Sequence, residues 1–183
     1  MKRSLVVALA TIGLTLATAG TSTAAKPLKT DTSRTTTAAT AGYWGHWLTP
    51  ALVYDATGTG TTFKVSEAVS EWSKSGWKVS MTTDPTKATI TVLKQDPVSG
   101  DGAIGSADLT VSGGVISGCV VRLSPVLASM SLGEHAASHE LGHCGGLPHS
   151  TSSKSIMYET VSSNSALVRP SGSDLKWMAK NVY

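Results

Sequence analysis

The sequence has little excess charge of either sign, and this limits the partners that it can bind. It contains 15 Lys and Arg residues against 12 Asp and Glu residues. Two of the basic residues are Lys2 and Arg3; without them the balance is 15 − 2 = 13 against 12, a net charge of +1. The pI of about 8.9 therefore gives no indication of nucleic acid or an anionic membrane as a partner.

Long hydrophobic runs are absent after residue 25, so no later segment approaches the length of a membrane span. Residues 1–25 have a basic start, a stretch rich in Leu, Val and Ala, and small residues at Thr23-Ala24-Ala25, which is typical of a secretory signal peptide. An uncleaved membrane anchor is the alternative, although Thr and Gly dilute the run. The pattern predicts a secreted, extracellular protein that has no stable membrane insertion once the signal is removed.

Apolar periodicity is absent from residues 26–41, which are rich in Thr and Ala. We expect them to form a disordered linker or a short propeptide. From residue 42 onward aromatic residues and periodic apolar segments begin. The length and the 40% content of hydrophobic residues predict one folded domain, which we place at residues 42–183, with no internal repeat. We expect it to act as a monomer.

Within that domain the apolar patterns alternate between strand and helix periods. Trp72, Trp77 and Trp177 are expected in the core. Strands and helices in this order predict an α+β or mixed α/β domain. The expected strands are 51–55, 77–82, 88–93, 103–109 and 115–123, with the last two forming a hairpin, and the expected helices are 62–75, 131–144 and 173–181.

One stretch, HELGHCGGLPHS at residues 139–150, concentrates residues that bind metals. On a helix, His139 and His143 project from the same face. Gly146 and the glycine before it suit a helix end at which the chain turns back, bringing His149 to the same ion. Three imidazoles with an open fourth position predict a catalytic zinc site, and Glu140 is placed to accept a proton from a zinc-activated water, which is chemistry that hydrolyses amides. A histidine-rich helix end without metal is the alternative.

These letters resemble the zinc-binding signature of the metzincin metallopeptidases, and Ser155-Ile156-Met157-Tyr158 resembles their Met turn. The spacing is most similar to the matrixin branch. The resemblance implies a small twisted, mostly parallel sheet with an antiparallel edge strand, an active-site helix and a C-terminal helix. It also implies site roles: zinc ligands at His139, His143 and His149, the general base at Glu140, and an apolar floor beneath the metal at Met157.

The sequence departs from matrixins in the loop of residues 94–114, which contains no histidine. A second, structural zinc is therefore not expected. Asp96, Asp101 and Asp108 leave calcium binding open, but acidic loop residues are more often simply solvated. No cysteine precedes Cys119, so the inhibitory cysteine of matrixin propeptides is missing, and any latency must use residues 26–41 or another protein.

Other positions have two interpretations each. Cys119 and Cys144 are predicted to form a disulfide between the sheet and the active-site helix, with two unlinked thiols as the alternative. Asp174 either supports the Met turn, as an aspartate does in matrixins, or serves as a helix-start charge. His135 is assigned to a partly exposed helix face, and His46 to packing or the surface.

Together these observations predict a secreted zinc metalloendopeptidase that hydrolyses protein or peptide substrates. The substrate is expected to lie extended along the strand at 103–109, with specificity set by a pocket around residues 159–164. The alternative is a catalytically silent zinc-containing protein, toxin-like or otherwise, that binds a partner without cleaving it.

Overall fold

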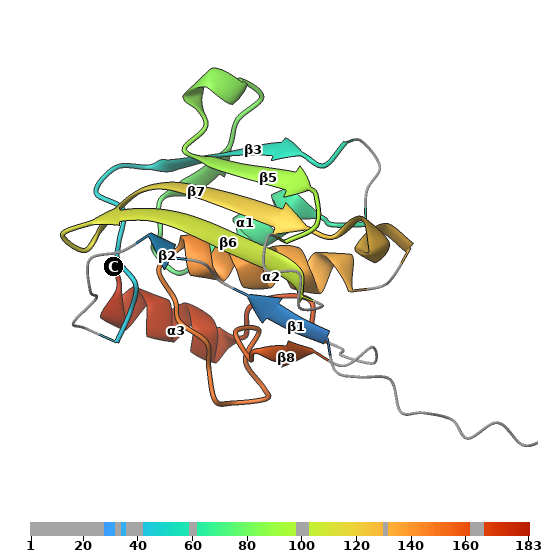
Figure 1. The fold of residues 1–183 in the computed structure, drawn as a ribbon. Coiled ribbons are helices and arrows are strands. Elements are labelled where there is room, and N and C mark those ends of the chain that lie inside the picture. Colours follow the sequence, from blue (N-terminus) through green and yellow to red (C-terminus); the bar gives the residue numbers. More distant parts are fainter. Residues whose placement is uncertain are drawn as a thin grey trace, which may run out of the picture.

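The computed structural model describes residues 28–31, 34–35, 42–58, 62–97, 103–129, 132–161 and 167–183. Four parallel strands form one side of its sheet in the order β4-β3-β5-β7, with β4 at the edge, and the next neighbour of β7, β6, is antiparallel to it (Figure 1). The strands are β3 (Ala51–Ala56), β4 (Val79–Met81), β5 (Ile90–Lys94), β6 (Ala103–Ser112) and β7 (Val115–Leu123). This mixed α+β architecture confirms the predicted fold class.

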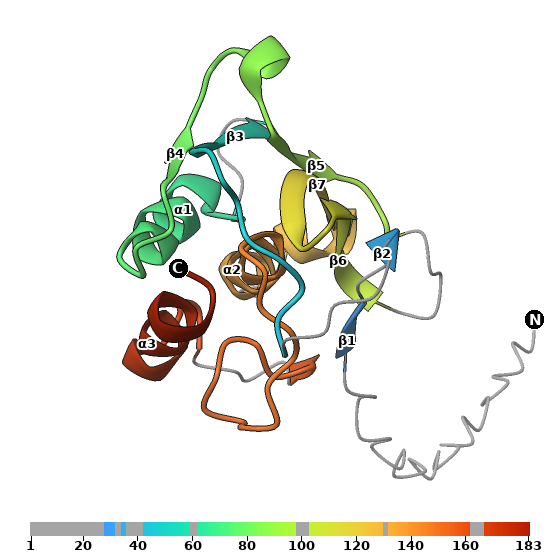
Figure 2. The ribbon, with the colours of Figure 1, turned by 90° about the vertical axis from the view of Figure 1, so that its left-hand side faces the viewer.

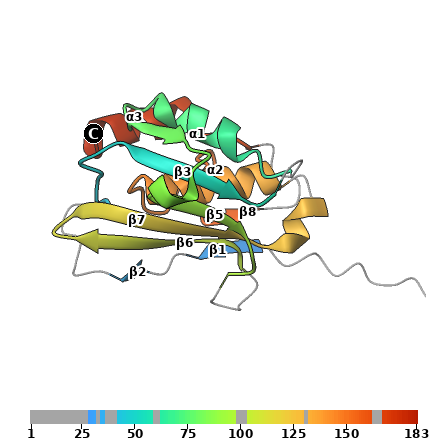
Figure 3. The same ribbon diagram turned by 90° about the horizontal axis from the view of Figure 1, so that it is seen from above.

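Three helices cover one face of this sheet, as Figure 3 shows from above. They are α1 (Val65–Ser73), α2 (Gly133–Cys144) and α3 (Gly172–Asn181). Two 3-10 turns, η1 (Pro85–Lys87) and η2 (Pro125–Ser129), connect strands and helices. Figure 2 looks along the axis of α2. This helix has strands β6 and β7 on one side and helices α1 and α3 on the other. In the described residues no helix combines the length and apolar character needed to cross a bilayer.

The central position of α2 explains its burial, because nearly every one of its residues meets either the sheet or another helix. Trp72 of α1 is completely buried, and its indole Nε1 donates to the Ser138 carbonyl at 2.8 Å. Trp47 is also buried, and its Nε1 donates to the Cys144 carbonyl at 2.8 Å. Each indole therefore fills the core and satisfies a backbone group of the helix that carries the histidines.

The expectation for the tryptophans is confirmed at two positions and wrong at the third. Trp72 and Trp77 are buried, whereas Trp177 is 38% exposed. α3 turns Asp174 and Met178 inward instead. Helical spacing alone did not indicate which side of this short amphipathic helix faces the core.

Three short strands extend the sheet beyond β6. They are β1 (Leu28–Asp31), β2 (Arg34–Thr35) and β8 (Thr160–Val161). β1 pairs parallel to β6 and antiparallel to β8, so it lies between them (Figure 1). β2 pairs with β6 further along. Two of these strands fall within residues 26–41, where the sequence offered no apolar periodicity.

A disulfide joins Cys119 of β7 to Cys144 at the end of α2, as the sequence predicted. The two Cα atoms are 5.7 Å apart. Both residues are buried, so the bond connects the centre of the sheet directly to the last turn of the helix.

Candidate metal centre

Three histidines converge at the end of α2. Their candidate ligand atoms all lie within 4.8 Å of one another. His139 and His143 are one turn apart on the helix, and Gly146 then takes a φ of +102°, in the region that glycine adopts most readily. A Cβ at this position would collide with the Gly45 carbonyl, so glycine is needed for two reasons. The turn reverses the chain and brings His149 to the two helical histidines.

Backbone carbonyls fix the tautomers of the two helical imidazoles. The Nδ1 of His139 donates to the Ile156 carbonyl at 2.7 Å, and the Nδ1 of His143 donates to the Leu147 carbonyl at 2.7 Å. Because a carbonyl oxygen only accepts, the proton of each neutral ring is on Nδ1, and each Nε2 presents a lone pair.

The two Nε2 atoms are 3.0 Å apart, so two lone pairs face each other in a buried site. A cation between them removes that repulsion, and two nitrogens on one tetrahedral zinc are separated by about 3.3 Å. The donor set therefore fits zinc. Carbonyl bonds to the remote ring nitrogen are also the usual support of metal-bound histidine.

Burial keeps these imidazoles neutral. It lowers the pKa of His139 to about 3, despite the opposing effect of the bond to the Ile156 carbonyl. It lowers the pKa of His143 well below its usual value, and the neighbouring His139 and His149 rings add to this effect. Neutral imidazole is the form that binds a metal, so neither residue needs to lose a proton near pH 7.

Glu140 follows the first histidine, and its side chain lies against β6. The residue is fully buried. A Cβ at Gly105 of β6 would lie 2.6 Å from the Glu140 Oε1, which shows how closely the carboxylate approaches the strand. Gly105 thus leaves the space that this carboxylate occupies.

The turn at residues 155–158 contacts α2 beside the histidines, and Asp174 holds it in place. The Ser155 hydroxyl donates to Asp174 Oδ1 at 2.5 Å, and the Ile156 amide donates to Oδ2 at 3.2 Å. The same carboxylate completes a capping box with Ser171 at the start of α3. The two roles that the sequence left open for Asp174 are therefore both present. Met157 is buried next to Gly142 of α2.

The histidines, their spacing and this turn invite comparison with known proteins. Residues 127–183 match the matrixin family. The match begins before α2 and continues through α3, so it includes all three histidines, Glu140 and Met157. No curated protein matches the chain. The matrixin match and the histidine cluster support a zinc metallopeptidase, a hydrolase of peptide bonds.

The carboxylates considered for calcium have other partners. Asp96 accepts a hydrogen bond from the Ser124 hydroxyl at 2.5 Å, and Asp108 pairs with Arg122. Asp101 lies outside the described residues. Among the residues that the structure describes, the three histidines are the one group of at least three potential ligands.

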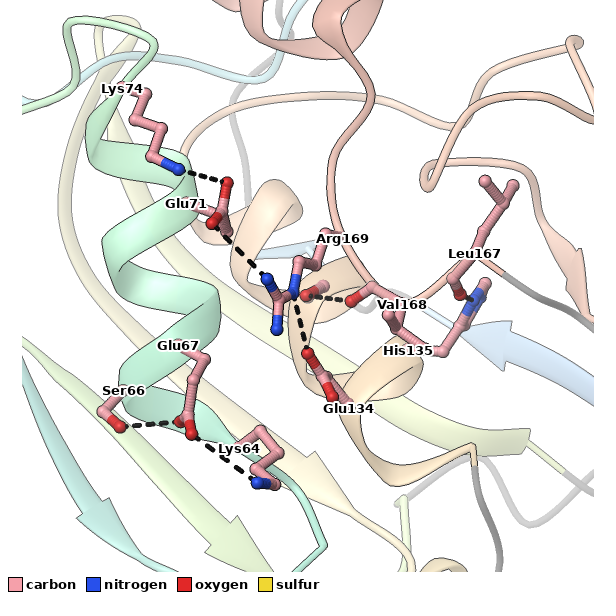
Figure 4. Close-up of polar contacts among 11 residues, drawn as sticks. Lys64, Ser66, Glu67, Glu71, Lys74, Glu134, His135, Leu167, Val168 and Arg169 are labelled. Carbon is pink, nitrogen blue, oxygen red and sulfur yellow. Dashed lines mark hydrogen bonds and ion pairs between the residues drawn. The ribbon is translucent and has the colours of Figure 1, made fainter.

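The structure also shows contacts that the sequence did not predict. Residues 167–169, which follow the turn at residues 155–158, contact helices α1 and α2 (Figure 4). His135 Nδ1 donates to the Leu167 carbonyl at 2.5 Å. Arg169 lies 3.1 Å from Glu134 and 3.9 Å from Glu71. The assignment of His135 to a partly exposed face was wrong, because the residue is 3% exposed.

Trp44 also contacts the site, and the sequence did not predict this contact. Its ring stacks on His143, with centroids 4.4 Å apart and an interplanar angle of 19°. Its backbone amide donates to the Gly146 carbonyl at 2.8 Å. Trp44 thus packs against one candidate ligand, a contact between residues 143 − 44 = 99 positions apart that no local pattern encodes.

A cavity of about 410 Å³ lies beside His149. Its walls include Leu147 and Met157, together with Asp174 and Trp177 of α3. The specificity pocket was predicted around residues 159–164. Residues 159–161 are not among the residues that line this cavity, and residues 162–164 lie outside the described ranges.

Proposed function

We propose that this protein is a secreted zinc metalloendopeptidase that acts as a monomer on extended protein or peptide chains. The facing Nε2 atoms of His139 and His143, held by carbonyl bonds beside the buried Glu140, are the observation that supports it best. His139, His143 and His149 would hold one zinc ion. Secretion is proposed from the signal-like residues 1–25 and agrees with a disulfide, which persists in oxidising compartments.

When bound, zinc would supply Lewis-acid polarisation and a more acidic water. The chain's own residues would do the rest. Glu140 would accept a proton from the attacking water and return it to the departing amine, since it follows the first ligand and lies within the site. Met157 would keep the floor of the site apolar, and the carbonyls of Ile156 and Leu147 would keep the two imidazoles oriented.

The substrate would lie along β6, the strand that approaches Glu140 at Gly105. Backbone pairing with a strand gives affinity that is largely independent of sequence, while side-chain pockets select particular residues. This arrangement suits cleavage within a chain, because neither end of the substrate is required for pairing.

The test compares the secreted protein with its Glu140→Gln variant, both loaded with zinc, on a mixed peptide library analysed by mass spectrometry. We expect the variant to retain one zinc per chain and to cleave at least about 100-fold more slowly, because the amide cannot accept the proton. Equal cleavage by both proteins would contradict the role of Glu140.

A second control is His149→Gln, which should lower zinc content as well as hydrolysis. Cleavage by neither the parent nor any variant, with the parent folded and zinc-loaded, would contradict the peptidase. It would favour a zinc-containing protein that binds a partner.

A further inference from the structure

Residues 43–47, which lie shortly before β3, are attached to two separate parts of the domain. At the end of α2, the Trp44 amide donates to the Gly146 carbonyl at 2.8 Å. At the β6–β7 hairpin, the His46 amide donates to the carbonyl of the turn at 3.0 Å, and the His46 carbonyl accepts from an amide of β7 at 2.8 Å. The segment therefore bridges the hairpin and the helix end that carries the histidines.

Close contacts of the main chain fix the segment between these two attachments. Gly45 is buried there, and a Cβ on it would lie 2.9 Å from the Gly114 carbonyl oxygen. A Cβ on Gly146 would lie 2.0 Å from the Gly45 carbonyl oxygen. Because backbone packs on backbone at both sides, the place of the Trp44 Cα relative to α2 does not depend on the Trp44 side chain.

From this fixed place the Trp44 side chain reaches two of the three candidate ligands. Its ring stacks on His143 and meets His149 edge-on, with centroids 6.5 Å apart and an interplanar angle of 70°. The indole is only half-buried, at the border of the core. One face of a large aromatic side chain is thus in contact with an imidazole of the metal centre.

The stack restrains a motion that the hydrogen bond of His143 leaves possible. The bond from Nδ1 to the Leu147 carbonyl holds one corner of the ring, and the ring can still tilt about this bond. A tilt would move Nε2 away from the other ligand atoms. A flat partner at 4.4 Å resists the tilt, since it would separate the two stacked faces.

The same stack favours the metal-bound state. An imidazole that binds a zinc ion takes up part of its positive charge, and the electron-rich face of an indole attracts a cationic group within about 6 Å. The attraction is therefore stronger when metal is bound than when it is absent. An interaction that is stronger in one state shifts the equilibrium toward that state.

We propose that Trp44 is a positioning residue of the metal centre, which orients His143 before zinc binds and stabilises this ring afterwards. The inference rests on the zinc site of the proposed function. Trp44 lies outside residues 127–183, which match the matrixin family. Part of the zinc affinity would thus come from the beginning of the domain.

The experiment compares the full-length parent with its Trp44→Phe and Trp44→Leu variants. Phe and Leu leave a similar space unfilled and keep the amide that binds Gly146, but only Phe has a flat ring. The zinc dissociation constant of each protein is measured by competition with a chromophoric chelator. The melting temperature of the metal-free proteins checks folding, and tryptophan emission is followed during titration with cobalt(II), which quenches a nearby indole.

We expect Trp44→Leu to weaken zinc binding by about tenfold or more, as when other supports of metal-bound histidines are removed. We expect Trp44→Phe to weaken it by less than about threefold, because a phenyl ring still stacks on His143. Cobalt(II) should quench a larger fraction of the emission in the parent than in Trp44→Phe, which lacks the indole beside the ligands.

Equal zinc affinity in the parent and Trp44→Leu would overturn the role of Trp44 and leave the metal centre intact. Equal losses in the two variants would overturn stacking as the cause. If Trp44→Leu does not fold, equal quenching in the parent and Trp44→Phe would still overturn the inference. A folded parent that binds no zinc would overturn the metal centre, and the role of Trp44 with it.

Discussion

The Ser155 hydroxyl donates to the Asp174 carboxylate across 2.5 Å, which links the turn beneath the histidines to the first turn of α3. The other carboxylate oxygen accepts from the amides of Ile156 and Ser171. Since Ile156 also provides the carbonyl that orients His139, one buried carboxylate supports both a helix start and a candidate metal ligand.

Replacing Asp174 should therefore weaken the fold and the site together. In Asp174→Asn, an amide hydrogen bond donor replaces one acceptor, so we expect the free energy of unfolding to fall by about 2–4 kcal/mol. Urea denaturation measures it. Asp84→Asn is the matched control, because Asp84 makes exposed bonds to Thr86, and a loss as large in this control would contradict the role of burial.

Gly105→Ala should impair the site without changing its ligands. The added methyl would meet the Glu140 carboxylate, so we expect the carboxylate to move and peptide hydrolysis to fall at least about tenfold, with one zinc retained. Gly118→Ala in β7 is the control, since the nearest atom to its Cβ is 3.5 Å away. Equal rates for the two alanine variants would show that Glu140 tolerates the methyl.

Acid should destabilise the chelator-treated protein before most carboxylates titrate. The pKa of His139 falls from 6.5 in a model peptide to about 3 in the fold. Between these values the unfolded chain binds the additional proton, so this residue alone lowers the free energy of unfolding by up to about 1.4 kcal/mol for each pH unit below 6.5, and His143, whose pKa is also lowered, adds to the slope.

Denaturation at pH 7.5 and pH 5 measures this slope, and His139→Gln should make it less steep without abolishing it, because His143 also titrates below its usual pKa. The stability from His139 is fully present above pH 6.5 and is lost on acidification, because the folded-state pKa is the lower one. A parent protein equally stable at both pH values would contradict the burial of a neutral imidazole.

The disulfide should contribute substantially to stability. It closes a loop with a sequence separation of 25, for which loop entropy predicts about 3.5 kcal/mol. The double variant Cys119→Ala, Cys144→Ala should unfold that much more easily. A reducing agent should destabilise the parent similarly and leave the double variant unaffected; any further loss in the double variant would indicate a different cause.

Local patterns were sufficient to predict the central fold and the convergence of His139, His143 and His149. The strand at 115–123 matches β7, and the helix expected at 131–144 corresponds to α2, on which His139 and His143 lie about one turn apart. The positive φ of Gly146, a conformation that glycine adopts readily, explains why the chain reverses direction there. These features depend on residues that are close in sequence, so hydrophobic periodicity and conformational preferences of single residues are enough to predict them.

Contacts between distant segments could not be predicted in this way. The pairing of β1 with β6 uses backbone groups, so the side-chain pattern of residues 28–31 does not predict it. The burial of His135 depends on the Leu167 carbonyl, 32 residues away. The stacking of Trp44 on His143 likewise depends on how β3 and the end of α2 are placed by the whole domain.

One consequence follows from the position of Cys144, which is joined by a single peptide bond to the candidate ligand His143. Two chemically unrelated equilibria, thiol oxidation and metal occupancy, then act on the same helical turn. Thermodynamic reciprocity requires that whatever the oxidised bond adds to metal affinity, the bound metal adds to the bond's resistance to reduction. Reducing conditions would therefore release the metal more readily, and metal depletion would make the cysteines easier to reduce.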